Sequence, residues 1–485
     1  MAAANLSFIF HLPSSFPRLC GHPRVAPFPY SLFPLCSREE LKEQLDALQC
    51  HFTWKMGIQV YNPQHLLQKL EIEINHTAHQ NQVALLGLQA HLYQLNNQSA
   101  EALRSLRAAE EHNEQQEEAA ATAGSVIIYG NYAWVHYLQG SYQEARSYLQ
   151  RAQQLCPHPW DMRLIPHIQA QKGWSLLVIR AQNGDRAREC FDLALMLEPD
   201  NRSFHTGLAM ALYSSWKFSW QPDAASEATI HLERVVREQP NNYRAKIYLA
   251  QLLEHVAKER SIGLVEECAE ESSDPEVLKL SIMFWIPRST DRAVEIARRA
   301  LEDDPGYHLL YQALAKSYKQ QWLQANEEDK DEILDVAINH LQQIVQGHPD
   351  LDITIVKLQL AELIGERDPA REEEIYMELQ EQSDTLSLRC RQGLLINWGK
   401  FLLYRRGSQD RAKAKFMEAY SIPMQTFQRR DCGRRLRRMA ETYRRNGDAE
   451  TADGIYRFLQ EADRHLPGQN VPLGLEDGDQ PPPAE

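Results

Sequence analysis

The sequence predicts an all-α fold, a right-handed superhelix of about nine or ten stacked helix pairs. One observation is a motif of alanine, further residues four and seven positions on, and proline twelve positions after the alanine. A second is its recurrence, with clear copies beginning at Ala145, Ala187, Ala228, Ala293 and Ala337. Spacings of four and seven lie on one helix face, and proline ends a helix. Because one helical hairpin cannot bury its apolar face alone, the copies are expected to stack into a solenoid with a concave inner surface.

The clearest copy, residues 168–199, identifies the pair as a tetratricopeptide repeat. Trp174 lies in its first half, and Ala187, Phe191 and Pro199 mark its second half. Alanine lets neighbouring helices approach, and the phenylalanine fills the space between them. This spacing is typical of the repeat, in which two antiparallel helices occupy about 34 residues.

Helical patterning begins ahead of the repeats. Ser37 and Glu40 have the spacing of a capping box, and a first apolar face runs from Leu41 to Phe52. A second helix is predicted after Pro63. Residues 1–36 contain no acidic residue and several prolines, which predicts a disordered extension, with an import signal as the alternative.

Weaker copies and gaps complete the array. The weaker copies begin at Ala102, Ala412 and Ala452. The gaps at 228–293 and 337–412 each leave room for one degenerate repeat. Three stretches interrupt the period and are expected to be longer helices or loops, namely 214–226, 261–274 and 320–331. The expected organisation is N-terminal and central repeats in 37–260, C-terminal repeats in 261–466 and a disordered tail in 467–485.

Composition narrows the class of protein. The 485 residues are 43% apolar and 24% charged, as in soluble globular proteins, and carry a net charge of −14. No stretch approaches the roughly 18–20 apolar residues of a membrane helix. Residues 388–465 hold about 18 Lys and Arg against about 9 Asp and Glu. This basic region is either a solvated helix face or an entrance for an anionic polymer.

No pattern indicates catalysis, a metal or a cofactor. There is no glycine-rich phosphate loop, no H-E-x-x-H and no G-x-S-x-G. His76 and His79 lack further ligands at zinc spacing, and His51 lies among core-facing residues, so we expect it to be packed. The eight cysteines are scattered without a C-x-x-C pair, which predicts reduced, mostly buried thiols in the cytosol.

Four short segments carry a family resemblance. They are CHFTW at 50–54, YGNYAWVHY at 129–137, GWSLL at 173–177 and NWGKF at 397–401. In this order they resemble the interferon-induced proteins with tetratricopeptide repeats, from about residue 37 to 466. The resemblance implies a cytosolic, non-catalytic antiviral effector that holds the 5′ end of foreign single-stranded RNA, as a triphosphate or an incompletely methylated cap, in a basic tunnel. Aromatic stacking on a base and cations on phosphates suit that ligand.

The resemblance also implies candidate RNA-binding residues. They are Lys69, Trp174, Met210, Arg244, Lys246 and Lys279. Trp174 stands where the family stacks a base, Met210 where an apolar residue lines the pocket, and Lys279 where an arginine faces RNA. The alternatives are packing between helices for the tryptophan and ordinary ion pairs for the cations.

Other positions depart from the family pattern. Val178 and Ser214 replace two phosphate-binding cations, Gly184 replaces a tyrosine, and Glu73 replaces a glutamine. Charge-assisted bonds contribute roughly 1.5–3 kcal/mol each, so losing two would weaken phosphate binding about 100-fold. A pairing motif is half present, since Gln460 stands four residues after Tyr456 in place of leucine. The alternative function is therefore a protein-interaction scaffold, with host proteins or other family members as partners.

Overall fold

A computed structural model describes residues 38–58, 63–77, 81–156, 164–179, 183–219, 222–349, 351–424 and 426–464. These residues form 22 helices and no strand. Two helices come first, α1 (Arg38–Asp46) and α2 (Pro63–His76). Ten antiparallel pairs follow: α3 (Gln82–Leu95) and α4 (Ser99–Asn113), α5 (Glu118–Leu138) and α6 (Tyr142–Leu155), α7 (Ile165–Ile179) and α8 (Gly184–Leu197), α9 (Arg202–Ser219) and α10 (Pro222–Glu238), α11 (Tyr243–Leu253) and α12 (Lys258–Glu271), α13 (Pro275–Trp285) and α14 (Thr290–Asp303), α15 (His308–Gln324) and α16 (Lys330–Gly347), α17 (Thr354–Ile364) and α18 (Pro369–Glu381), α19 (Leu388–Tyr404) and α20 (Gln409–Ser421), α21 (Phe427–Arg445) and α22 (Ala449–Arg464).

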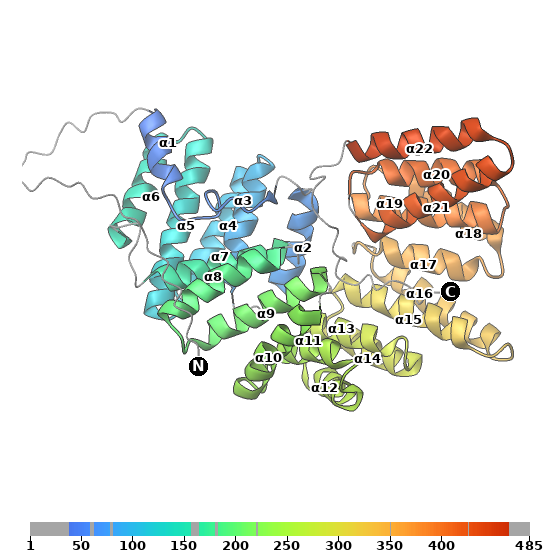
Figure 1. Ribbon diagram of the computed structural model, residues 1–485, viewed down its shortest axis with the longest axis horizontal. Coiled ribbons are helices and arrows are strands. Elements are labelled where there is room, and N and C mark those ends of the chain that lie inside the picture. The colour runs from blue at the N-terminus through green and yellow to red at the C-terminus, as the bar shows by residue number, and fades with distance from the viewer. Residues whose placement is uncertain are drawn as a thin grey trace, which may run out of the picture.

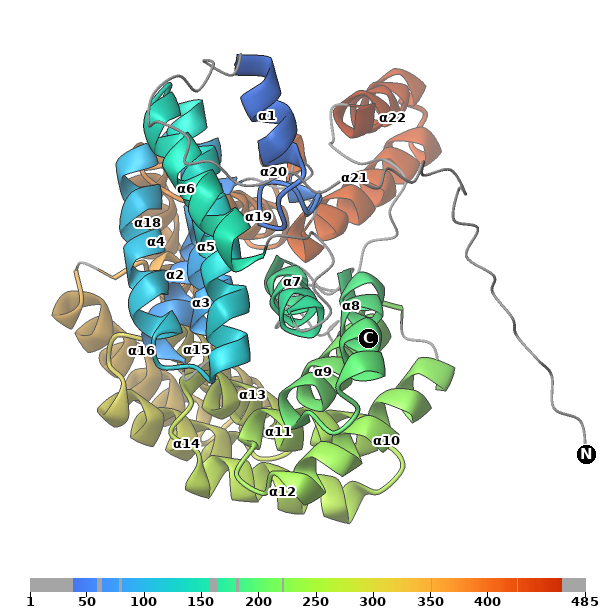
Figure 2. The same cartoon turned by 90° about the vertical axis from the view of Figure 1, so that its left-hand side faces the viewer.

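The pairs stack into a curved, two-layered solenoid. Each odd-numbered helix from α3 to α19 packs against the next odd-numbered helix, whereas even-numbered helices pack mainly against the odd-numbered helices beside them. The odd-numbered helices are therefore the inner layer and the even-numbered helices the outer layer. Figure 1 shows the N-terminal and C-terminal pairs at opposite ends, joined below by α9–α14, and Figure 2 shows the same arc from its end. The predicted all-α superhelix is confirmed.

The repeat motif explains this packing. The motif alanines that begin the five clear copies are 0% exposed. Phe191 is also fully buried, and a Cβ added to Gly173 or Gly207 would lie 2.8 or 2.2 Å from its ring. Burying such a side chain contributes about 1.5–3 kcal/mol. Helices α8, α10, α14 and α16 each end two residues before a motif proline.

Three predictions about helix boundaries have different outcomes. The two degenerate repeats exist, as α11 with α12 and α17 with α18. The interruption predicted at 261–274 is wrong, because most of that stretch belongs to α12 and pairs regularly. Helix α1 ends at Asp46 and does not reach Phe52, because the chain then turns so that Thr53 Oγ1 donates to Leu48 O over 2.6 Å. Ser37 lies outside the described residues, so its capping box with Glu40 stays a prediction. The division at 260/261 falls within α12 and also stays a prediction.

Candidate functional site

The three N-terminal family motifs meet in one buried hydrogen-bond hub. The hub joins His51 after α1, Asn131 on α5 and Ser175 on α7. The His51 backbone N–H donates to Asn131 Oδ1 (3.1 Å), and Asn131 Nδ2 lies 3.0 Å from His51 Nδ1. His51 Nε2 lies 3.0 Å from Ser175 Oγ. Burial, followed by electrostatic repulsion from His91, lowers the pKa of His51 to about 3, so the ring is neutral. The prediction that His51 is a packed histidine is confirmed.

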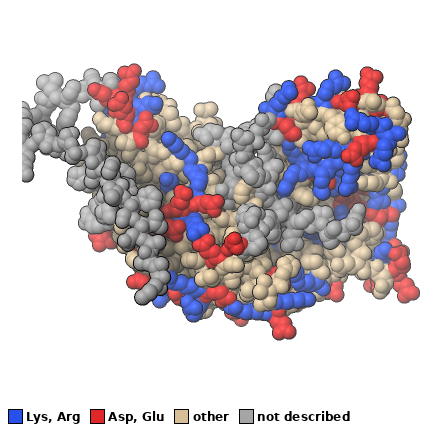
Figure 3. Space-filling model, viewed as in Figure 1, with Lys and Arg blue, Asp and Glu red and all other residues tan. Residues whose placement is uncertain are grey.

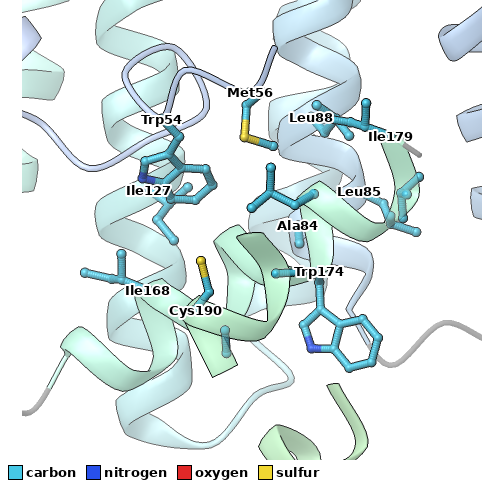
Figure 4. Close-up of a cluster of buried hydrophobic side chains, with 14 of the residues drawn as sticks. Trp54, Met56, Ala84, Leu85, Leu88, Ile127, Ile168, Trp174, Ile179 and Cys190 are labelled. Carbon is cyan, nitrogen blue, oxygen red and sulfur yellow. The ribbon is translucent and has the colours of Figure 1, made fainter. Parts of the chain in front are cut away.

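Close backbone approaches and aromatic contacts fix this hub. A Cβ added to Gly87 would lie 2.5 Å from His51 Cε1. Trp134 Nε1 donates to Leu45 O over 3.1 Å, and its ring stacks on Phe52 with centroids 6.0 Å apart. Trp54 lies in the adjoining apolar cluster (Figure 4). The motifs therefore hold α1, α5 and α7 together and supply no reactive group.

Trp174 and Met210 lie on neighbouring inner helices, α7 and α9, and each is 8% exposed. The Trp174 ring packs edge-on against Phe191 with centroids 5.3 Å apart. Its Nε1–H is nevertheless buried without a hydrogen-bond acceptor among the described residues. In Figure 4 the indole points away from the other labelled side chains of its cluster. Trp174 thus packs between helices and also presents an unsatisfied donor.

Two of the positions that depart from the family pattern, Val178 and Gly184, offer no cation to phosphate. Val178 is an apolar, buried side chain on α7. A Cβ added to Gly184 would lie 2.4 Å from Ser215 Oγ and 2.6 Å from the Ser215 backbone N. The start of α8 therefore lies directly against α9, and a tyrosine at position 184 does not fit this arrangement.

Helix α2 crosses to the central repeats through charged contacts. Glu73 on α2 lies 3.3 Å from the Arg244 guanidinium on α11, which also lies 3.0 Å from Asp274. His76 on α2 lies 2.8 Å from Asp304 at the end of α14. Burial opposes the charge of Arg244, but the two carboxylates raise its pKa well above the ordinary value. Arg244, a candidate RNA-binding residue, thus lies beside α2 and is paired with the carboxylates of Glu73 and Asp274.

The other predicted cations are engaged in the same way. Lys279 lies 2.6 Å from Glu276, which also accepts a hydrogen bond from Tyr307 over 2.5 Å. Lys246 is buried, 2.5 Å from Glu267 and 4.9 Å from the centre of the Tyr243 ring. Lys69 is half-buried on α2, four residues before Glu73. The ion-pair alternative therefore describes Arg244, Lys246 and Lys279. Contact with RNA stays a prediction for all six candidate RNA-binding residues.

The basic C-terminal region is partly internal. Arg429 is buried, lies 2.9 Å from Asp463 and stacks 3.8 Å from the centre of the Tyr420 ring. Asp431 accepts from Arg434 and Arg435. Arg437 and Arg438 are exposed, and Figure 3 shows Lys and Arg gathered at the end of the molecule where Figure 1 places α19–α22. The exposed arginines match the solvated helix face, whereas an entrance for an anionic polymer stays a prediction.

Within the described residues, no group of three or more His, Cys, Asp and Glu side chains could hold a metal ion. None of the described helices is long and apolar enough to cross a membrane. The six described cysteines are free thiols and five of them are buried, which confirms that part of the prediction for those residues.

The fold and the inner layer define a tetratricopeptide-repeat protein. A family model described as Tetratricopeptide repeat matches residues 126–159. The antiviral innate immune response effector IFIT1 of Homo sapiens is 27% identical over 410 residues, covering 80% of this chain and 85% of that protein. Interferon-induced protein with tetratricopeptide repeats 2 of Homo sapiens is 27% identical, covering 91% and 97%. The solved structure of the human IFIT1 dimer with PPP-AAAA shares the fold, with a TM-score of 0.55 and 24% identity over 88% of this chain and 98% of that one. Over most of its length the chain is therefore similar to interferon-induced proteins with tetratricopeptide repeats.

Proposed function

We propose that this protein is an interferon-induced, cytosolic effector of antiviral innate immunity that binds the 5′ end of single-stranded RNA without catalysis. Relatives along most of the chain include an antiviral innate immune response effector. Solved structures with the same fold hold PPP-AAAA or m7Gppp-AAAA. These likenesses support an RNA 5′ end as the ligand.

The place of Trp174 on inner helix α7, beside Met210 on α9, carries this proposal. Its buried N–H also lacks an acceptor within the described part of the chain, as do those of Trp285 and Trp398. A buried donor without an acceptor costs about 1–3 kcal/mol, so native proteins usually supply a partner. A nucleotide has hydrogen-bond acceptors on its base, sugar and phosphate, and an aromatic ring is the usual platform for an unpaired base. Met210 on the neighbouring inner helix supplies apolar surface beside α7.

The charges support an altered preference for the RNA end. Arg244, Lys246 and Lys279 already lie against carboxylates, and two further family cations are Val178 and Ser214 here. A triphosphate would therefore find fewer cations available than the family pattern provides. We propose that capture depends more on base contacts with Trp174 and less on phosphate charge.

The test compares RNAs of one sequence that carry a 5′-hydroxyl, a 5′-triphosphate or a methylated or unmethylated cap. Binding to the full chain is measured by fluorescence anisotropy. Trp174→Ala is expected to lower affinity for the preferred end about tenfold or more, since base stacking contributes about 1–3 kcal/mol. Helical circular dichroism should be unchanged. The matched control is Trp322→Ala on α15, which should bind as the parent chain does. Equal affinity of the parent chain for all four RNAs would disprove end capture.

A further inference from the structure

The outer helices are tied together by pairs of arginine and carboxylate. These pairs span neighbouring outer helices from α8 to α20: Arg188–Glu227 joins α8 to α10, Arg260–Glu233 joins α10 to α12, Arg292–Glu266 joins α12 to α14, Arg367–Asp331 joins the turn before α18 to α16, and Arg411–Glu373 joins α18 to α20. Their N–O distances run from 2.5 to 3.1 Å. In each pair a carboxylate fills the gap between two outer helices.

The gap between α14 and α16 is the exception among the described residues of this series. No ion pair spans it, and two adjoining hollows of about 520 and 530 Å³ lie there. Both hollows are lined by Arg298 and Glu302, one turn apart on α14. Neither residue has a charged partner within 4.0 Å among the described residues. Leu301 and Ile344 add apolar surface to one hollow.

Hydrogen bonds position the polar groups of this groove. Arg298 Nη2 donates to Tyr318 Oη over 2.7 Å, and Tyr318 Oη lies 2.7 Å from His340 Nδ1. The Tyr318 hydroxyl therefore joins the arginine to the imidazole of His340. Arg298 keeps further N–H donors, because this contact uses only its Nη2. Tyr311 and His348, 2.8 Å apart, form a second such pair along the groove.

We propose that the groove between α14 and α16 docks a peptide segment of a protein partner, in which an acidic side chain pairs with Arg298 and a basic one with Glu302. The acidic side chain takes the place that a carboxylate of the neighbouring outer helix takes elsewhere in the series. Arginine and carboxylate form paired, directional hydrogen bonds, so the site selects a carboxylate over an amide of the same shape. The apolar floor at Leu301 and Ile344 receives an apolar side chain between the charged ones. This surface lies on the outer layer and is independent of the proposed RNA site on the inner layer.

The test uses the full chain and two fluorescent 12-residue peptides, three repeats of Glu-Leu-Lys-Ala and three repeats of Gln-Leu-Lys-Ala. Anisotropy should show binding of the glutamate peptide and at least about tenfold weaker binding of the glutamine peptide. Arg298→Gln should lower affinity for the glutamate peptide to that of the glutamine peptide. The control Arg260→Gln removes an arginine from a filled gap nearby and should leave affinity unchanged.

Three outcomes would overturn the proposal. They are equal binding of the two peptides, unchanged binding by Arg298→Gln with intact helical circular dichroism, and displacement of the peptide by 5′-hydroxyl RNA. A charge exchange sharpens the test: Arg298→Glu should bind three repeats of Lys-Leu-Lys-Ala more tightly than the parent chain does.

Discussion

The hub at His51 and the crossing at Arg244 are both polar, and both join segments far apart in the sequence. The hub is neutral: one histidine, one asparagine and one serine satisfy each other inside the core. The crossing is charged, with Arg244 between Glu73 and Asp274. The hub uses residues of the family motifs, whereas the crossing uses positions that the resemblance assigned to RNA. Family motifs can therefore mark the scaffold, while Arg244, a position that the resemblance assigned to RNA, is paired with carboxylates.

Substitutions in the hub and in the crossing should also lower the stability of the protein by different amounts. Removing a member of a neutral hub leaves a dipole without a partner, which costs about 1–3 kcal/mol. Removing the cation from a largely buried ionic group leaves carboxylates uncompensated, which costs about 3–5 kcal/mol. The following predictions test that difference.

Arg244→Met should have the largest effect on stability. Glu73 and Asp274 would lose their shared cation at a site where all three side chains are less than 20% exposed. We expect the free energy of unfolding in urea, followed by circular dichroism, to fall by about 3–5 kcal/mol. Arg260→Met removes a pair that is 52% and 31% exposed, and should cost less than about 1 kcal/mol. If the two variants lose similar amounts of unfolding free energy, burial of the ion pair does not determine its contribution to stability.

Acidification should destabilise the hub. Burial lowers the pKa of His51 to about 3 and that of His91 to about 4, from an ordinary 6.5. The unfolded chain therefore takes up these protons first, and stability present at pH 7 is lost as the pH falls from about 6.5 toward 4. At pH 5 each histidine costs about 2 kcal/mol.

The share of His51 can be isolated by substitution. His51→Gln should reduce the loss of unfolding free energy between pH 7 and pH 5 by about 2 kcal/mol, although the variant is less stable at pH 7. His255→Gln, at an exposed position, should leave the loss unchanged. If His51→Gln and the parent chain show the same loss, His51 is not the neutral group that the hub requires.

The sequence was sufficient for the fold because the repeat signal is redundant. Motif alanines such as Ala187 and Ala293 are fully buried, and the spacing even located the two degenerate pairs. The turn after α1 was missed because Leu48 and Phe52 continue the helical spacing of Leu41 while Thr53 bonds back to Leu48.

The site was less predictable, because its contacts join residues far apart in the sequence. Nothing in the neighbourhood of Glu73 indicates that Arg244 lies across from it, 171 positions later. The hub had a signal, since His51 and Asn131 both stand in family motifs, but spacing alone does not show that they meet. Trp174 packs on Phe191 as the alternative interpretation expected, and its role in RNA binding stays a prediction.

Glu73→Gln should have the smallest effect on stability. Glutamine keeps an oxygen for Arg244 and for Thr77 Oγ1, which lies 3.2 Å from Glu73, while removing one negative charge beside the guanidinium. We expect affinity for 5′-triphosphate RNA to rise about fivefold, roughly 1 kcal/mol, because less carboxylate charge then opposes phosphate. Affinity for 5′-hydroxyl RNA should stay constant. Glu270→Gln on outer helix α12 is the matched control and should change neither affinity. An equal gain in affinity for both RNAs would show a general charge effect and would mean that Glu73 does not lie near the bound RNA end. A gain for 5′-triphosphate RNA alone would identify Glu73 as the residue that sets the preference for the RNA end.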